Sequence, residues 1–125
     1  MSSKNGTLPS TAGLKRLPAR FYRSDNGREP VREWLKSLPP EDRQAIGEDL
    51  KDVEFSWPIG MPLVRSLGRE LCEVRSSLRH GRIDRVIFCI REGNMVLLHG
   101  FIKKSQKTPH REIEVALKRK MGTSG

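Results

Sequence analysis

The sequence predicts an α+β fold in which a small central antiparallel sheet packs against an N-terminal helical hairpin and a C-terminal helix. Three observations support this. Apolar residues follow a helical period in the first half of the chain, short apolar segments separated by turn residues fill the second half, and the last segment returns to the helical period. The length of 125 residues indicates one domain with one modest core.

The helical hairpin is predicted from residues 31 to about 56. Pro30 suits the first position of a helix, and Pro39-Pro40 ends the segment Val31–Leu38. A second helix begins near Pro40 and ends at Trp57-Pro58. In this helix Leu50 and Val53 follow Ile46 by four and seven residues, which places the three apolar side chains on one helical face.

Five segments have the character of strands: Phe21–Arg23, Leu63–Leu67, Leu71–Ser76, Ile83–Arg91 and Asn94–Ile102. The last two contain long apolar runs, which is typical of strands covered on both faces. Leu71–Ser76 instead alternates, with Glu73 and Arg75 pointing away from Cys72 and Val74. We therefore expect one side of that strand to be polar and accessible.

The C-terminal helix is predicted to begin with Thr108 as its cap and Pro109 as its first residue. Its apolar stripe is Ile113, Ala116 and Leu117. The expected organisation is a disordered basic tail over residues 1–19, a folded domain over 20–121 and a short tail over 122–125.

Composition restricts the classes of partner. The formal net charge of +9 favours a polyanion such as nucleic acid, an acidic protein or an anionic membrane surface. No apolar run is long enough to cross a bilayer, and no secretory signal is recognisable. Cys72 and Cys89 are expected to be buried reduced thiols of a cytoplasmic protein. Because the three histidines are scattered and no cofactor-binding motif occurs, we expect neither a metal nor a cofactor.

The densest candidate for chemistry is the basic segment that follows the last strand. Lys103, Lys104, Gln106 and Lys107 can donate to phosphate oxygens, and Phe101 has the ring needed to stack on a base. A solvated loop explains the same composition equally well.

Arginines within the apolar strands form the second candidate. A buried guanidinium needs a partner, so Arg85 either pairs with Glu73 or joins Arg75 in a cleft that holds a phosphate. We expect Arg79 and Arg82 at the rim of such a cleft. His99 is expected to be half-buried and hydrogen-bonded, with proton transfer as the alternative role.

These motifs together resemble a known group of proteins. The order is a helical hairpin, then Leu-Cys-Glu-Val-Arg, then Ile-Asp-Arg-Val-Ile-Phe, and then His-Gly-Phe-Ile-Lys-Lys-Ser-Gln-Lys-Thr-Pro before a helix. This arrangement, from Phe21 to Met121, is similar to the phage-derived, HigB-like branch of the RelE toxin superfamily. The string that begins at His99 is its most specific part.

The resemblance implies the toxin of a type II toxin–antitoxin system, a metal-independent endoribonuclease that cleaves mRNA on the ribosome. It also implies a cognate antitoxin with a helix-turn-helix DNA-binding domain. The residues that match the catalytic groups of the family are Arg75, Arg85, Lys103 and Lys104, with Glu73 as a base or as the orienter of an arginine. The expected RNA contacts are Phe101, Gln106, Lys107, Arg79, Arg82 and His99. The chain ends without the C-terminal tyrosine or histidine that some relatives use for proton transfer.

Two other functions fit the same composition. A non-catalytic nucleic-acid-binding protein of phage origin would bind RNA with the same salt sensitivity but leave it intact. A phage-type assembly protein would use the positive charge only for an acidic protein partner.

Overall fold

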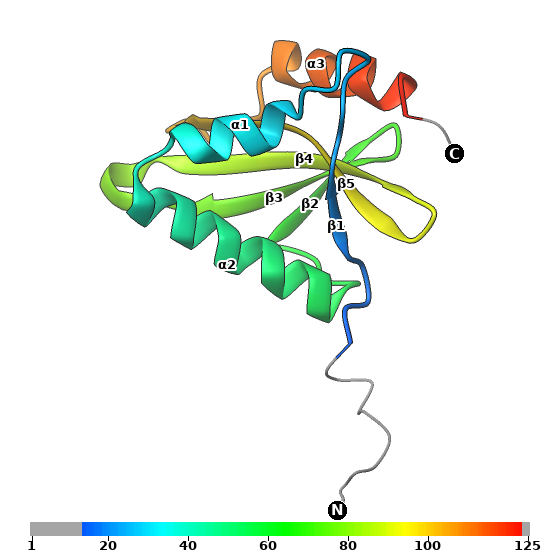
Figure 1. Cartoon of the computed structure of the whole chain (residues 1–125). Helices are drawn as coiled ribbons and strands as arrows, with labels where there is room; N and C mark the ends of the chain where they lie inside the picture. Colours follow the sequence, from blue (N-terminus) through cyan, green and yellow to red (C-terminus); the bar gives the residue numbers. More distant parts are fainter. Residues whose placement is uncertain (1–13, 124–125) are drawn as a thin grey trace, which may run out of the picture.

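The computed structural model describes residues 14–123 and confirms the predicted α+β architecture (Figure 1). A short 3₁₀ turn, Arg79–Gly81, lies between the strands Leu71–Ser77 and Ile83–Arg91. The elements in chain order are β1 (Ala19–Phe21), α1 (Pro30–Ser37), α2 (Pro40–Ser56), β2 (Val64–Gly68), β3 (Leu71–Ser77), β4 (Ile83–Arg91), β5 (Asn94–Lys103) and α3 (His110–Met121).

The five strands form one sheet in the order β1-β5-β4-β3-β2. Strands β2 to β5 are antiparallel, as expected from their short connections. Strand β1 pairs with β5 in parallel, so the sheet is mixed rather than purely antiparallel. Parallel strands need a long connection, and here two helices and three strands lie between β1 and β5 in the sequence.

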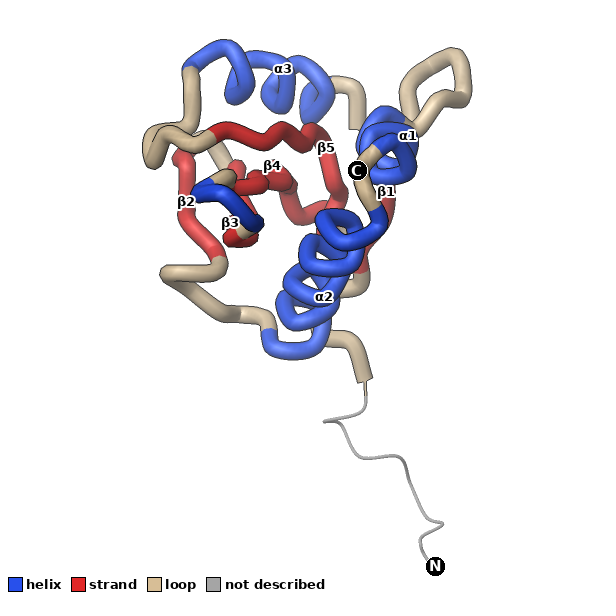
Figure 2. Tube along the Cα trace, turned by 90° about the vertical axis from the view of Figure 1, so that its left-hand side faces the viewer, coloured by secondary structure: helices blue, strands red, loops and turns tan. Residues whose placement is uncertain are grey.

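Helices cover both faces of the sheet. Figures 1 and 2 show α3 on one side and the pair α1 and α2 on the other. Val86 and Phe88 of β4 belong to the core under α1 and α2, whereas Ile87 and Cys89 belong to the core under α3. The prediction that the apolar strands are covered on both faces is therefore confirmed for β4.

Proline fixes the start of both N-terminal helices as predicted. Pro30 and Pro40 occupy first helical positions, where a missing N–H breaks no hydrogen bond. The predicted start of α3 is wrong, because that helix begins at His110 with Pro109 as its N-cap residue. The hydroxyl of Thr108 does not cap the helix but donates to Glu73 on β3.

The packed part of the chain extends further toward the N-terminus than residue 20. Leu17 is buried in the core, and the backbone N–H groups of Arg16 and Leu17 both donate to the carbonyl of Glu54. Strand β1 accordingly begins at Ala19, two residues before the predicted strand. Of the tails expected over residues 1–19 and 122–125, residues 1–13 and 124–125 lie outside the described residues.

The cysteines are free thiols on opposite faces of the sheet. Cys72 packs against the core under α1 and α2, and Cys89 belongs to the core under α3. Of the helices within residues 14–123, none has both the length and the apolar character required to span a membrane.

Candidate functional site

The sheet face under α3 brings the predicted cationic residues together. Arg75, Arg85 and Phe101 lie directly opposite one another on β3, β4 and β5. Lys103 lies opposite Ile83 in the next row of the same face. Because side chains two residues apart on a strand share a face, cations from three strands and Glu73 lie on one surface.

Residues 104–109, which we call the covering loop, lie over this surface. Arg75 donates from Nη2 to the carbonyl oxygen of Gln106 at 3.0 Å and to its Oε1 at 3.1 Å. Arg85 donates to the carbonyl oxygen of Ser105. Thr108 donates to Oε1 of Glu73 at 2.5 Å. The strands therefore hold the loop by three side chains, and the loop in turn closes much of the sheet face.

Arg85 is fully buried beneath the covering loop. Its guanidinium lies 5.6 Å from the centre of the Phe101 ring, and its Nε and Nη1 atoms have no hydrogen-bond partner within residues 14–123. Burial lowers the pKa of Arg85, and the neighbouring Arg75 guanidinium lowers it further, while Glu73 opposes the shift. In this arrangement the side chain supports the loop and does not reach solvent.

Three expectations from the sequence need correction here. The polar side of β3 is not open, because Glu73 is fully buried and only 12% of the Arg75 side chain is exposed. The ion pair of Glu73 is with Arg75, at 3.7 Å, rather than with Arg85. Phe101 is 7% exposed and packs in the core under α3, so its ring is not available to stack on a base.

Arg75 lies at the boundary between this closed surface and an open groove of about 500 Å³. The groove exists because β3 extends beyond β2, whose first pair is Val64 with Val74. The Arg75 backbone N–H still donates to the carbonyl of Leu63 at 2.8 Å, after which the edge of β3 is not paired by β2. The groove is lined by Asp49, Met61, Pro62, Leu63, Arg75, Ser77, Ile83 and Gln106.

The groove has one polar and one apolar part. Arg75, Gln106 and Ser77 supply donors, whereas Met61, at 63% exposed, and Ile83 supply apolar surface. Such a combination suits a ligand with a charged backbone and flat rings, as in single-stranded RNA. Of the predicted residues, Arg75 and Gln106 line this groove.

Asp49, Met61 and Ser77 line the groove but were not predicted from the sequence. Asp49 is one of many acids on a helix, Met61 follows the end of α2, and Ser77 ends a strand. No local pattern distinguishes them. They meet only because α2 packs against β3 and because the segment after α2 returns along the edge of the sheet.

The side chains of His99 and Lys103 both contact Glu112 of α3, and neither of them lines the groove. Nε2 of His99 lies 2.7 Å from Oε1 of Glu112, and Nζ of Lys103 lies 3.5 Å from Oε2. Although burial alone would raise the pKa of Glu112, the bond with His99 and the charge of Lys103 lower it below its usual value. The expectation of a half-buried, hydrogen-bonded His99 is confirmed.

Arg79 and Arg82 connect the turn between β3 and β4 to α2. Arg82 donates to both carboxylate oxygens of Asp42, at 2.8 and 3.0 Å. This pairing lowers the pKa of Asp42 despite its burial. Arg79 is 72% exposed on its side chain and pairs with Glu41 at 3.3 Å. Both arginines are thus engaged with acids of this chain.

Lys104 and Lys107 are exposed on the covering loop and form no ion pair with any residue of the described chain. They are the predicted cations that remain free to bind a polyanion next to the groove. Within residues 14–123, no three His, Cys, Asp or Glu side chains gather in a way that could hold a metal ion.

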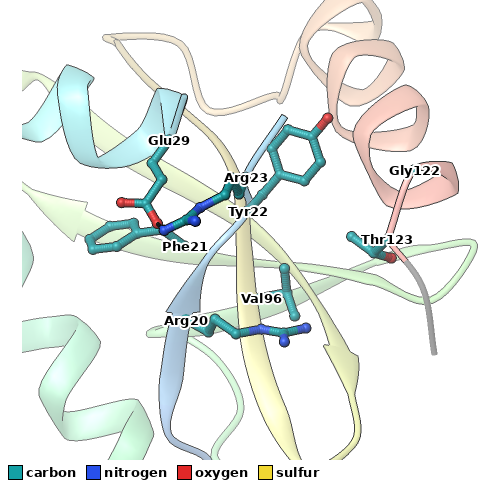
Figure 3. A pocket seen from close by; sticks show the side chains of 8 residues that line it. All are labelled: Arg20, Phe21, Tyr22, Arg23, Glu29, Val96, Gly122 and Thr123. Carbon is teal, nitrogen blue, oxygen red and sulfur yellow. Dashed lines mark hydrogen bonds and ion pairs between the residues drawn. The ribbon is translucent and has the colours of Figure 1, made fainter. Parts of the chain in front are cut away.

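A separate hollow of about 380 Å³ lies at the β1 edge of the sheet (Figure 3). Figure 3 shows Arg20 beside Val96, while Arg23 points toward Glu29, with which it pairs at 3.4 Å. None of the residues predicted for the site lines it. Of these two hollows, the groove beside Arg75 is lined by residues predicted for the site.

Comparison with known protein families gives one result that covers most of the chain. The model of the family described as "Phage derived protein Gp49-like (DUF891)" matches residues 33–121, from within α1 to the end of α3. The match includes every residue that lines the groove. No curated protein matches the chain.

Proposed function

This chain belongs to the Gp49-like family of phage-derived proteins, a family of the RelE/HigB-like toxin group, and from that premise we propose that it is an endoribonuclease. In this proposal it is the toxin of a toxin–antitoxin pair and cleaves mRNA without a metal. The resemblance adds three further parts to the proposal: cleavage on the ribosome, membership of the HigB-like branch, and an antitoxin with a helix-turn-helix domain.

The observation that carries the proposal is the position of Arg75 beside the groove. Its guanidinium is oriented by Glu73 and by two bonds to Gln106, and part of it remains exposed. An oriented guanidinium matches the geometry of a phosphate and needs little reorganisation as charge develops there. Lys104 and Lys107 stand on the adjoining loop, where they suit contacts to phosphates of neighbouring nucleotides.

RNA supplies its own nucleophile. Its 2′-hydroxyl attacks the adjacent phosphorus, and the products are a 2′,3′-cyclic phosphate and a 5′-hydroxyl. The protein must align the nucleotide and stabilise the negative charge of the transition state, which we assign to Arg75. Arg85 and Glu73 act on this step only indirectly, since Arg85 supports the covering loop and Glu73 orients Arg75.

The test is cleavage of a labelled RNA by Arg75→Ala in a chelating buffer. Loss of one such electrostatic contact lowers cleavage rates by about 10²–10³. The same substitution leaves the buried carboxyl of Glu73 without its cation, and loss of such a partner destabilises a fold by up to about 3–5 kcal/mol. The double variant Glu73→Gln/Arg75→Gln removes both charges together and separates loss of activity from loss of stability.

Arg91→Ala is the matched control, because it removes the same charge at the last residue of β4, which does not line the groove. We expect it to cleave at the wild-type rate. Wild-type activity in both Arg75 variants would refute the assignment. A substrate with a 2′-deoxy residue at the cut site must resist cleavage if the 2′-hydroxyl is the nucleophile.

Burial of Phe101 and Arg85 favours one second candidate, a non-catalytic nucleic-acid-binding protein. Arg85 was expected to be catalytic and Phe101 to stack on a base, whereas the exposed Lys104 and Lys107 remain available to contact a phosphate backbone. This candidate predicts RNA that is bound in a salt-sensitive manner but remains intact.

A further inference from the structure

We propose that Asp49 accepts the proton of the attacking 2′-hydroxyl. The inference rests on the proposed function and adds a residue of α2 to it. It answers a question that the sequence leaves open, since metal-free attack needs a proton acceptor.

The other side chains that could accept this proton are not available to a substrate in the groove. Glu73 is fully buried and accepts the Thr108 hydroxyl, so substrate does not reach it. His99 is bound to Glu112 under α3, and neither residue lines the groove. Asp49 is the one acid among the eight groove-lining residues of the described chain.

The position of Asp49 on its helix explains why it faces the groove. It immediately precedes Leu50 and lies three residues after Ile46, so it borders the buried stripe of α2. Asp42, which lies two turns earlier on the same side of α2, is paired with Arg82. Asp49 forms no ion pair with any residue between 14 and 123, so its carboxylate remains free for a substrate.

The charge pattern of the groove also favours a chemical role. A carboxylate beside a phosphate repels it, so a groove that only binds RNA would be better served by a neutral or basic residue. Asp49 lines the same groove as Arg75, a cation that can hold the phosphate against this repulsion. An acid and a cation that line one groove are the groups that an attack by a hydroxyl on a phosphodiester requires.

The step balances without a co-reactant other than water. The bond between the 2′-oxygen and phosphorus forms as the bond between phosphorus and the 5′-oxygen breaks. The 2′-proton passes to the carboxylate of Asp49, and the 5′-oxygen takes a proton from water. Asp49 then returns its proton to solvent at the open groove.

The experiment measures single-turnover cleavage and RNA affinity of Asp49→Asn. General-base catalysis contributes about 10²–10⁴ in rate, so cleavage should slow by a factor in that range. Affinity for RNA should be unchanged or higher, because a repulsive charge is removed. Asp52→Asn is the matched control: it removes the same charge from the exposed side of α2 and should cleave at the wild-type rate.

Chemical rescue separates a proton acceptor from a structural residue. In Asp49→Ala, added formate should restore part of the lost rate, because a small carboxylate can occupy the vacated space. The inference is overturned if wild-type protein cleaves and Asp49→Asn cleaves equally fast, if only the choice of cut site changes, or if formate restores nothing. If wild-type protein leaves RNA intact, the proposed function fails first and this inference fails with it.

Discussion

Replacement of Asp84 by asparagine should stabilise the protein at neutral pH. Asp84 is fully buried on β4, opposite Ser76 of β3, and neither of its carboxylate oxygens has a hydrogen-bond partner within residues 14–123. Burial, with smaller contributions from Asp49 and Asp42, raises the pKa of Asp84 from 3.8 to about 8, although Arg85 opposes the shift. The native protein therefore keeps a proton on this residue at pH values at which the unfolded chain has released it.

The size of the effect follows from proton linkage. Between pH 3.8 and about 8 the unfolded state binds fewer protons than the native state, so stability falls as pH rises. The slope is about 1.4 kcal/mol per pH unit, which over the roughly three units from 3.8 to neutral pH amounts to about 4 kcal/mol. That is a large part of the about 5–15 kcal/mol that stabilises an ordinary domain. Asparagine carries no proton to lose and keeps the shape of the side chain.

The assay is urea unfolding of the wild type and Asp84→Asn between about pH 4.5 and 7.5. The stability advantage of the variant should be about 1 kcal/mol at the acidic end and grow to about 4 kcal/mol near pH 7. Asp25→Asn, at an exposed turn, should show no such growth. A difference between wild type and Asp84→Asn that stays constant with pH would refute the linkage argument.

Two further predictions concern packing and one buried hydrogen bond. Gly100→Ala should destabilise the protein by about 1–3 kcal/mol in urea unfolding, because its Cβ would lie 2.3 Å from an atom of the Trp34 ring. Gly47→Ala, with nothing within 4 Å, should instead stabilise α2 by up to about 1 kcal/mol; equal effects of the two changes would argue against the packing explanation. Thr108→Val should cost about 1–3 kcal/mol, because Oε1 of the buried Glu73 loses the hydroxyl that donates to it, and unchanged stability would contradict this.

The sequence predicted the order of elements well because that order depends on local patterns. A helix buries one face when its apolar residues are spaced as Ile46, Leu50 and Val53 are, and the apolar run of β4 is stable only where both faces of the strand are covered. Proline positions fixed two helix starts for an equally local reason. The boundary of α3 was wrong because the Thr108 hydroxyl found a partner on a distant strand.

The candidate site was predicted only in part. The sequence identified Arg75 and Gln106, and the pairing of strands brought Arg75 next to Arg85. The accessibility predicted for Glu73 and Phe101 was wrong, and Arg85 bonds to the covering loop rather than to Glu73. Periodicity shows which side chains share a face, but whether a loop closes that face depends on contacts between residues 20 to 35 positions apart in the chain.

By itself, the sequence determined the fold class, the basic character of the protein and the face on which its strand cations lie. These properties follow from composition and from the two-residue repeat of a strand. Only the tertiary structure decided that Arg85 supports the covering loop, that Arg75 borders a groove and that Asp49 reaches the same groove from α2. The reason is that accessibility and proximity arise from the packing of separate elements, which leaves no signature in any short segment of the chain.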